Sequence, residues 1–338
     1  MSYSLSNIQI KNYLVASSSP LTESLERLQC CYEAGFSAAI LKSAAAYNRT
    51  GTGYGRKVVY TADGYYADAS FEREILTLQE GVALYTSASQ LCPSDMLLIP
   101  SISASSIDPK EWLESCKQFA VCGAPLLQLD FFYLDTLIHD SNFYNKLHQL
   151  LDMLVADLDC DIMPKLNLNL NFDPDYICKL LRECGIKTVS LLDSMREDPD
   201  ESLGLHKGTT SYFGKRQLPW TIRYLKVAKK FNLEVCAGGG IMSKQDVDTL
   251  LALGADMVQT ASYILHRDFS AAQDLLAPSL RPCNHLAILK HNPWCDCENG
   301  IPCENCGACT PHKVPSQIIK RENQVSESVG NSYGKLRT

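Results

Sequence analysis

The stretch from Glu234 to Leu265, EVCAGGGIMSKQDVDTLLALGADMVQTASYIL, decides how the fold is interpreted. Its apolar run 235–237 predicts a buried strand, and three glycines follow at once. Ser243 is typical of an N-cap, and the helix that it would begin ends at Gly254. A second buried strand is predicted at 257–259. Two strands joined through a helix are expected to be parallel, with a right-handed connection.

Glycines at the end of a strand allow main-chain N–H groups to approach a phosphate closely. Gly239 and Gly240 stand at such a place, and Ala261 and Ser262 end the next strand. Paired sites of this kind bind phosphate after the last two strands of (β/α)₈ barrels. The pattern therefore favours a phosphate site. A tight turn that only needs glycine is the alternative.

The same alternation of strand and helix extends over the preceding chain. Strands are expected at 13–17, 38–41, 96–100, 125–129, 162–166, 188–192, 235–237 and 257–259. Helices are expected at 22–35, 71–81, 109–122, 143–158, 173–184, 219–231 and 243–253. We predict a (β/α)₈ TIM barrel over residues 1–280, with a doubly wound sheet as the alternative. Residues 47–66 are expected to form an irregular lid or substrate loop, and 195–213 a polar loop.

Composition narrows the class of protein. The chain has 338 residues, 46% hydrophobic content and a net charge of −7, which is typical of an ordinary globular protein. A negative net charge gives no general attraction for nucleic acid or an acidic membrane surface. No stretch approaches the roughly 20 apolar residues of a spanning helix, and the N-terminus lacks a secretory pattern. We expect a cytoplasmic protein.

Fifteen cysteines are unevenly distributed. Ten lie in apolar surroundings, and five crowd between 295 and 309, within a predicted metal or Fe–S segment at 281–312. The five are Cys295, Cys297, Cys303, Cys306 and Cys309. This distribution favours a reducing compartment with one metal or redox site. The spacing fits a [4Fe–4S] cluster, although the usual Cys-Pro is missing, or structural Zn²⁺. A metal-free segment is a third possibility, and 313–338 is expected to be a flexible tail.

Polar residues gather where the predicted strands end, which is the catalytic face of a barrel. They are Ser17, Ser18, Lys42, Ser43, Gln128, Asp130, Lys165, Asp193, Ser194, Gly239, Gly240, Ala261 and Ser262. An unpaired lysine is costly to bury, so Lys42 and Lys165 are informative. Facing a phosphate site, the two lysines favour an anionic, electron-rich cofactor. Each could instead be a solvated rim residue.

In these pieces the chain resembles the FMN-dependent dihydroorotate and dihydropyrimidine dehydrogenase family. The likeness covers residues 8–275 and is carried by AGFSAAILKSA (34–44), PKLNLN (164–169) and AGGGIMSKQDVDTLLALGADMVQTAS (237–262). It implies FMN, with the flavin ring near Ser17, Ser18, Lys42 and Ser43, and with Lys165 at the N1–O2 side. The phosphate would be held by Gly239, Gly240, Ala261 and Ser262. Gln128, Asp193, Ser194 and Gly214 complete the implied cofactor contacts.

The substrate side departs from that family. Gln128–Tyr133 replaces the Asn-x-Ser-[Cys or Ser]-Pro-Asn motif that supplies the general base, and Phe131 cannot accept a proton. The family's substrate loop is also absent, with 62–68 in its place. We expect Asp130 to be the acid or base, with Tyr133 and Lys42 as further catalytic candidates. Tyr65 and Tyr66 could donate protons, form aromatic walls or simply pack.

The resulting expectation is an FMN oxidoreductase acting on CH–CH bonds, which moves hydride between flavin N5 and a small substrate other than dihydroorotate. An iron–sulfur cluster or an electron-transfer protein would exchange electrons with the flavin, and a homodimer is expected. Two alternatives remain at this point. One is a true dihydroorotate or dihydropyrimidine dehydrogenase with an unusual base. The other is a non-catalytic flavin- or metal-binding scaffold or sensor.

Overall fold

Parallel strands alternate with helices through nearly all of the chain that the computed structural model describes, which is residues 3–46, 57–68, 75–93, 95–137, 139–205 and 210–278. These residues belong to one unit, Met1–Pro278. The cysteine-rich segment 281–312, with its five predicted ligands, and the tail 313–338 lie outside the described residues.

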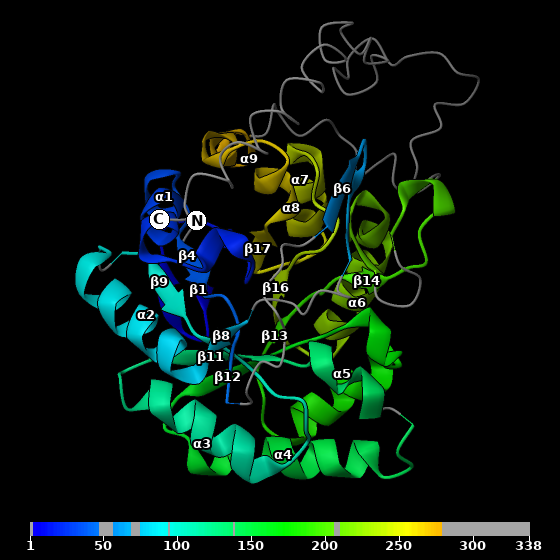
Figure 1. The fold of residues 1–338 in the computed structure, drawn as a ribbon. Coiled ribbons are helices and arrows are strands. Elements are labelled where there is room, and N and C mark those ends of the chain that lie inside the picture. The colour runs from blue at the N-terminus through cyan, green and yellow to red at the C-terminus, as the bar shows by residue number, and fades with distance from the viewer. Residues whose placement is uncertain are drawn as a thin grey trace, which may run out of the picture. The chain divides into compact units, whose positions relative to one another are not determined.

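The main sheet is parallel, and its strands follow one another in chain order (Figure 1). They are β3 (Leu14–Ala16), β4 (Ala38–Ile40), β9 (Leu97–Ile99), β10 (Ser101–Ser103), β11 (Leu126–Asp130), β12 (Asp161–Lys165), β13 (Thr188–Ser190), β16 (Glu234–Ala237) and β17 (Met257–Thr260). The last strand pairs with the first, Val258 opposite Leu14. A doubly wound sheet instead reverses its strand order.

The series of paired strands is interrupted between β9 and β10, and a single proline lies between these two strands. β4 pairs with β9 and β10 pairs with β11, while Pro100 lies between β9 and β10. Proline has no N–H to donate, but its carbonyl accepts a hydrogen bond from the N–H of Gln128 at 2.8 Å. The curled parallel sheet with its surrounding helices confirms the expectation of an α/β barrel.

The helices lie outside the strands (Figure 1). They are α1 (Leu25–Glu33), α2 (Leu78–Leu91), α3 (Pro109–Ala120), α4 (Phe143–Asp157), α5 (Pro174–Glu183), α6 (Leu218–Lys230), α7 (Lys244–Ala252), α8 (Ser262–Leu265) and α9 (Ala272–Leu276). Short 3₁₀ turns are η1 (Pro20–Thr22), η2 (Phe132–Leu137), η3 (Leu168–Leu170), η4 (Glu201–Leu203), η5 (Lys215–Gln217) and η6 (Phe269–Ala271). As predicted, Ser243 caps α7 and Gly254 follows its end with φ +96°.

The helix predicted at 71–81 is wrong in its placement, because α2 begins at Leu78 and continues to Leu91. The Thr77 hydroxyl accepts from the N–H of Glu80, whose carboxylate accepts from the N–H of Thr77. This capping box fixes the start. Gly81 does not end the helix. A Cβ there would lie 2.5 Å from the Cβ of Ala44, so glycine lets α2 pack closely on the sheet.

The predicted loops 47–66 and 195–213 are also wrong in part, because both contain strands. β6 (Lys57–Thr61), β7 (Gly64–Asp68), β15 (Thr210–Gly214) and β14 (Met195–Arg196) form an antiparallel sheet. Gly64 pairs with Gly214, and a Cβ on Gly64 would lie 2.3 Å from the carbonyl oxygen of Phe213. Two facing glycines therefore allow the two long connections to join.

The amino ends of the barrel strands enclose an apolar core. A hairpin of β1 (Tyr3–Leu5) and β2 (Ile8–Ile10) contributes Leu5 and Ile10 to it. The strands contribute Val15, Ala38, Ile40, Ile99, Leu126, Met163, Cys236 and Met257. The two-residue strands β5 (Ala44–Ala45) and β8 (Leu76–Thr77) extend the sheet at the other end. The apolar filling at one end leaves the polar strand residues at the carboxyl ends.

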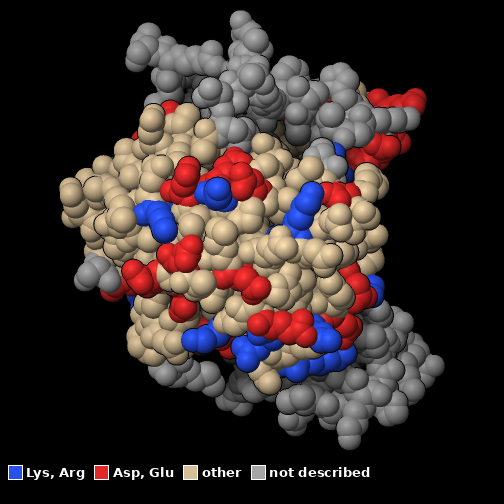
Figure 2. Space-filling view, turned by 90° about the horizontal axis from the view of Figure 1, so that it is seen from below, with Lys and Arg blue, Asp and Glu red and all other residues tan. Residues whose placement is uncertain are grey.

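No helix among the described residues is both long enough and apolar enough to cross a bilayer. Figure 2 shows one face of the protein, on which Lys and Arg side chains are interspersed with Asp and Glu. On that face neither sign of charge dominates.

Candidate functional site

Alternate residues of each barrel strand face the interior, and some of these inward-facing residues are polar. In β11, Leu126 belongs to the apolar interior, and Gln128 and Asp130 continue the same face of the strand. Leu127 and Leu129 face the helical layer instead. Asp130 is opposite Lys165 in the register of β11 and β12. The sequence alternation therefore places a carboxyl and an ammonium group side by side at the carboxyl ends.

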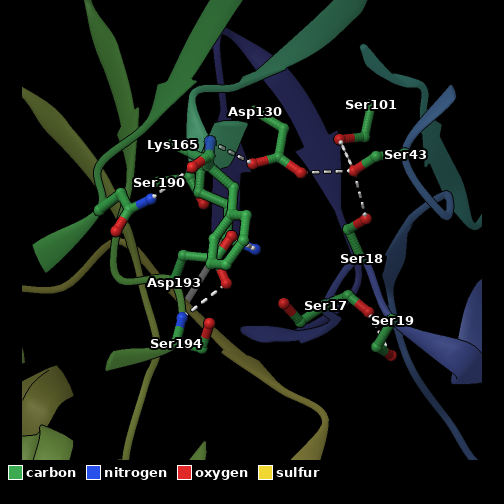
Figure 3. A network of polar contacts seen from close by, with 12 residues as sticks. Ser17, Ser18, Ser19, Ser43, Ser101, Asp130, Lys165, Ser190, Asp193 and Ser194 are labelled. Carbon is green, nitrogen blue, oxygen red and sulfur yellow. Dashed lines mark hydrogen bonds and ion pairs between the residues drawn. The ribbon is translucent and has the colours of Figure 1, made fainter. Parts of the chain in front are cut away.

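Asp130 accepts hydrogen bonds from two directions (Figure 3). Its Oδ2 accepts from the Ser43 hydroxyl at 2.7 Å, and its Oδ1 from the N–H of Phe132 at 3.1 Å. The Ser43 hydroxyl also lies 3.0 Å from that of Ser101 and 3.2 Å from that of Ser18. Three hydroxyl groups from three strand ends thus form a connected chain with the carboxyl group.

Lys165 and Asp193 form a buried ion pair with an Nζ–Oδ2 distance of 3.1 Å. Only 5% of Lys165 and 6% of Asp193 is exposed. Gln217 donates from Nε2 to the Asp193 carbonyl at 2.8 Å, which fixes the backbone beside the pair. A buried charge that is paired and held in this way is retained at a far smaller cost than an isolated one.

Burial raises the pKa of the Asp130 carboxyl above its ordinary value. The negative charge of Asp193 raises it further, while the positive charge of Lys165 and the hydrogen bond from Ser43 oppose the shift. The arrangement therefore makes the Asp130 carboxyl a weaker acid than an exposed aspartate.

Gln259 joins several strand ends beneath the glycine loop. Its Oε1 accepts from the Ser17 hydroxyl at 2.8 Å. Its Nε2 donates to Ser190 Oγ at 2.6 Å and to the carbonyls of Leu191 and Cys236 at 2.7 and 3.2 Å. Sequence reasoning missed Gln259, Ser190 and Ser101 as site residues. The feature that could have identified them is a polar side chain within an otherwise apolar strand.

Gln128 has one satisfied and one unsatisfied polar atom. Its Nε2 donates to Ser101 Oγ at 2.9 Å. Its Oε1 is buried and has no hydrogen-bond partner among the described residues, and the side chain is fully buried. An unsatisfied buried acceptor costs roughly 1–3 kcal/mol. A ligand N–H at this place would remove that cost.

The glycine loop follows β16 and lies next to the end of β17. Because Ala237 is opposite Val258, Gly240 and Ala261 each lie three residues beyond a paired position. Gly239 and Gly240 have φ values of +90° and +92°, which other residues rarely adopt. Within the described residues, the N–H groups of Gly239, Gly240 and Ser262 make no hydrogen bond to the protein. These donors fit an anion.

Close packing also contributes to the need for glycine in this loop. A Cβ on Gly238 would lie 2.4 Å from Gln259 Cγ, and one on Gly240 would lie 2.3 Å from the Leu218 nitrogen. At Gly239 the nearest atom would be Thr221 Oγ1 at 3.1 Å. Close packing alone therefore explains glycine at 238 and 240, as the tight-turn alternative requires. Gly239 is half-buried, and of the three positions it has the most space for a Cβ.

The other predicted residues fall into two groups. Lys42, Ser43 and Ser194 are buried at strand ends, and Tyr133 is half-buried in η2. Residues of the antiparallel sheet take structural roles: the Tyr66 hydroxyl accepts from Arg216 at 2.7 Å, Tyr65 stacks on Phe213 at 4.8 Å, and the Gly214 N–H donates to Gln217.

Phe131, at the position of the family's base, lies in the outer core and meets the Trp112 ring edge-on at 5.7 Å. It faces the helices, so its side chain contributes to packing. The buried carboxyl groups at the barrel mouth are those of Asp130 and Asp193.

Comparison with known proteins adds no relative. No protein-family model matches the chain, and no curated protein matches it.

Proposed function

We propose that this chain is an FMN-dependent oxidoreductase on a (β/α)₈ barrel. It would transfer hydride between flavin N5 and a small substrate, which is not dihydroorotate. The observation that carries the proposal is the buried Lys165–Asp193 pair, with Nζ and Oδ2 3.1 Å apart, at the same end of the sheet as the open N–H donors of Gly239 and Gly240. A cation and a phosphate site together suit an anionic cofactor with a polar ring.

The phosphate end of the cofactor would be held by Gly239, Gly240, Ala261 and Ser262. Main-chain donors without protein acceptors are well suited to phosphate oxygens, because they bind anions without a charged side chain. The two segments leave adjacent strands at matching positions, so their N–H groups can converge on one group. This agrees with the resemblance of 237–262 to the flavin-binding family.

The ring end would lie among Ser17, Ser18, Lys42, Ser43, Gln128 and Lys165. The unsatisfied Oε1 of Gln128 fits an N–H of the flavin ring. Lys165 has a physical purpose beside the N1 side, since its positive charge stabilises the anionic reduced ring. Bound FMN would supply the hydride chemistry, which no side chain of the barrel mouth can perform by itself.

Asp130 would hold the proton that accompanies hydride transfer. Its raised pKa keeps the carboxyl group protonated above the ordinary range, and its Oδ2 is hydrogen-bonded to Ser43. Such an acid can donate a proton to a developing carbanion or alkoxide and recover it in the reverse direction. Tyr133 and Lys42 remain secondary candidates, with Tyr133 nearest to Asp130 in the sequence.

The decisive experiment is an absorption spectrum of anaerobically purified full-length protein, with FMN quantified after denaturation. The expected result is a yellow protein with about one FMN per chain. Lys165→Met should weaken FMN retention, whereas Lys187→Met, at an exposed lysine preceding β13, should retain it. Colourless protein that takes up no added FMN would overturn the proposal.

The same spectrum examines the cysteine segment, which remains a proposed [4Fe–4S] or Zn²⁺ site outside the described residues. A broad iron–sulfur absorption that bleaches on reduction would identify the cluster, and metal analysis would identify zinc. A dye-linked assay with dihydroorotate separates the proposed substrate class from that of the dehydrogenases the chain resembles. Rapid turnover would show that the true substrate is dihydroorotate.

A further inference from the structure

Away from the barrel mouth, three side chains that can ligate metals converge on the helical layer. They are His148 and Asp152 of α4 and Cys184, which follows the last residue of α5. One donor atom from each lies within 4.8 Å of the other two. His148 and Asp152 are one helical turn apart, with Nδ1 and Oδ2 at 2.8 Å. No residue of this cluster belongs to the candidate flavin site.

Cys184 is fixed in place by the end of its helix. It is the C-cap of α5, and its N–H donates to the Leu180 carbonyl at 3.0 Å. Gly185 then adopts φ +80°, and the N–H of Ile186 returns to the Leu181 carbonyl at 2.9 Å. This left-handed ending is a rigid helix stop. The thiol therefore meets α4 at a defined place.

We propose that His148, Asp152 and Cys184 bind one borderline divalent cation, with Zn²⁺ as the physiological ion. An imidazole, a carboxylate and a thiolate are all zinc ligands, whereas Mg²⁺ and Ca²⁺ require oxygen donors. Tetrahedral zinc holds neighbouring donors roughly 3.3–3.8 Å apart, given its bond lengths. The distance between His148 Nδ1 and Asp152 Oδ2 would have to increase slightly, and donor atoms that are farther apart would have to approach one another. Side-chain rotation can achieve both.

The local charge favours a cation. The carboxyl end of α5 carries the negative end of the helix dipole. Asp152 and Glu183 add negative charge next to the Cys184 thiol. Burial, the hydrogen bond with Asp152 and these negative charges raise the pKa of the thiol. Positive charge nearby comes from Lys179, whose Nζ lies 3.6 Å from the Glu183 carboxylate, and from Arg182 in the last turn of α5. On binding, the thiol proton leaves to solvent, and the Cys184 thiolate and the Asp152 carboxylate together balance the two positive charges of the cation.

The place of the cluster indicates a structural role. α5 ends just before β13 begins at Thr188, so Cys184 lies towards the amino end of a barrel strand. The candidate flavin site lies at the carboxyl ends, and residues at the amino ends of barrel strands serve stability. A cation here would join α4 to α5. The two ligands on α4 are partly exposed, with 41% of the His148 side chain and 51% of the Asp152 side chain accessible. Water can therefore supply the fourth ligand.

Anaerobic titration with Co²⁺ and competition by Zn²⁺ tests the site. The full-length chain is used with five serines in place of the cysteines that would compete, namely Cys295, Cys297, Cys303, Cys306 and Cys309. The expected result is one Co²⁺ per chain, with a thiolate charge-transfer band and visible bands of tetrahedral cobalt. Zn²⁺ should displace it and raise the melting temperature.

Three variants and two controls locate the ligands. Cys184→Ser should abolish the charge-transfer band, and His148→Ala and Asp152→Asn should each weaken binding by about tenfold or more, on the scale of a perturbed metal site. Cys122→Ser, at an exposed thiol, and Glu183→Gln should leave the band in place. If the five-serine chain does not fold, the difference in Co²⁺ stoichiometry between native and Cys184→Ser chains gives the answer. Absence of a thiolate band, or a band that survives Cys184→Ser, would overturn the proposal.

Discussion

At the residue scale, the barrel mouth depends on how one ammonium group is shared between two buried carboxyl groups. Lys165 pairs with Asp193 at 3.1 Å, and Asp130 lies opposite Lys165 in the neighbouring strand. The alternation of β11 explains why Asp130 is buried, and the apolar pattern before it could be recognised in the sequence. The sharing of the ammonium group could not be recognised, because it depends on Asp193, which lies in a loop three positions after β13.

Asp130→Asn tests the protonation of that carboxyl group through stability. In the native chain the raised pKa means that Asp130 binds its proton more tightly when folded than when unfolded, where the carboxyl ionises near its ordinary pKa of about 3.9. Native stability contributed by this group is thus present at low pH and falls as pH rises, by up to about 1.4 kcal/mol per unit. Asn does not titrate, so the melting temperature of Asp130→Asn should increase relative to that of the wild type as the pH rises from 4. Asp175→Asn, at an exposed carboxyl, is the control. A pH-independent difference would contradict the protonated state.

Lys165→Met and Asp193→Asn test the ion pair. Each single change leaves one buried charge without its 3.1 Å partner and should cost about 3–5 kcal/mol. The double variant removes both charges, and its cost should be well below the sum of the two single costs. Urea unfolding of all four proteins measures the coupling. Additive costs would show that the two groups act independently.

At the element scale, strands could be predicted better than helix ends. A buried parallel strand is a short apolar run, and such runs were visible from Val15 to Val258. The start of α2 depends on a capping box at Thr77, and Gly81, a residue type that often ends helices, lies inside this one. β7 and β15 could not be predicted, because they are stabilised by pairing between residues far apart in the sequence. The separation is 142 positions for Asp68 with Thr210 and 150 positions for Gly64 with Gly214.

Thr77→Ala tests the capping box of α2. The change removes the hydroxyl that accepts from the N–H of Glu80, and the expected loss is about 0.5–2 kcal/mol of unfolding free energy. Ser87→Ala, at an exposed position within the same helix, should change stability by a few tenths only or increase it. Equal effects of the two variants would show that the cap is unimportant.

At the scale of the whole molecule, the order of strands could be predicted because regular alternation permits few topologies. The polar network could not. Ser101, Ser190 and Gln259 come from strands that are far apart in the sequence and meet only when the sheet curls. Their residue types are ordinary, so closure of the fold is what gives them a place at the site.

A chain that ends at Pro278 tests whether the barrel is independent of the residues that follow. Contacts place Met1–Pro278 in one unit, so the shortened chain should unfold in one cooperative transition and bind FMN like the full-length protein. Any iron–sulfur absorption should disappear with residues 279–338. Calorimetry and the visible spectrum measure both. Loss of flavin from a folded shortened chain would place part of the cofactor site beyond Pro278.

The hairpin β1–β2 has a kinetic consequence. Leu5 and Ile10 fill the barrel at the amino ends of its strands, so within the described residues the polar side chains of the interior lie towards the carboxyl ends. If the chain is the proposed flavin oxidoreductase, its reductant and oxidant would both approach from the carboxyl ends, and the first product would depart before the second reactant arrives. Initial rates measured with two freely diffusing substrates should give parallel lines in double-reciprocal plots. Intersecting lines would mean that electrons leave by another path.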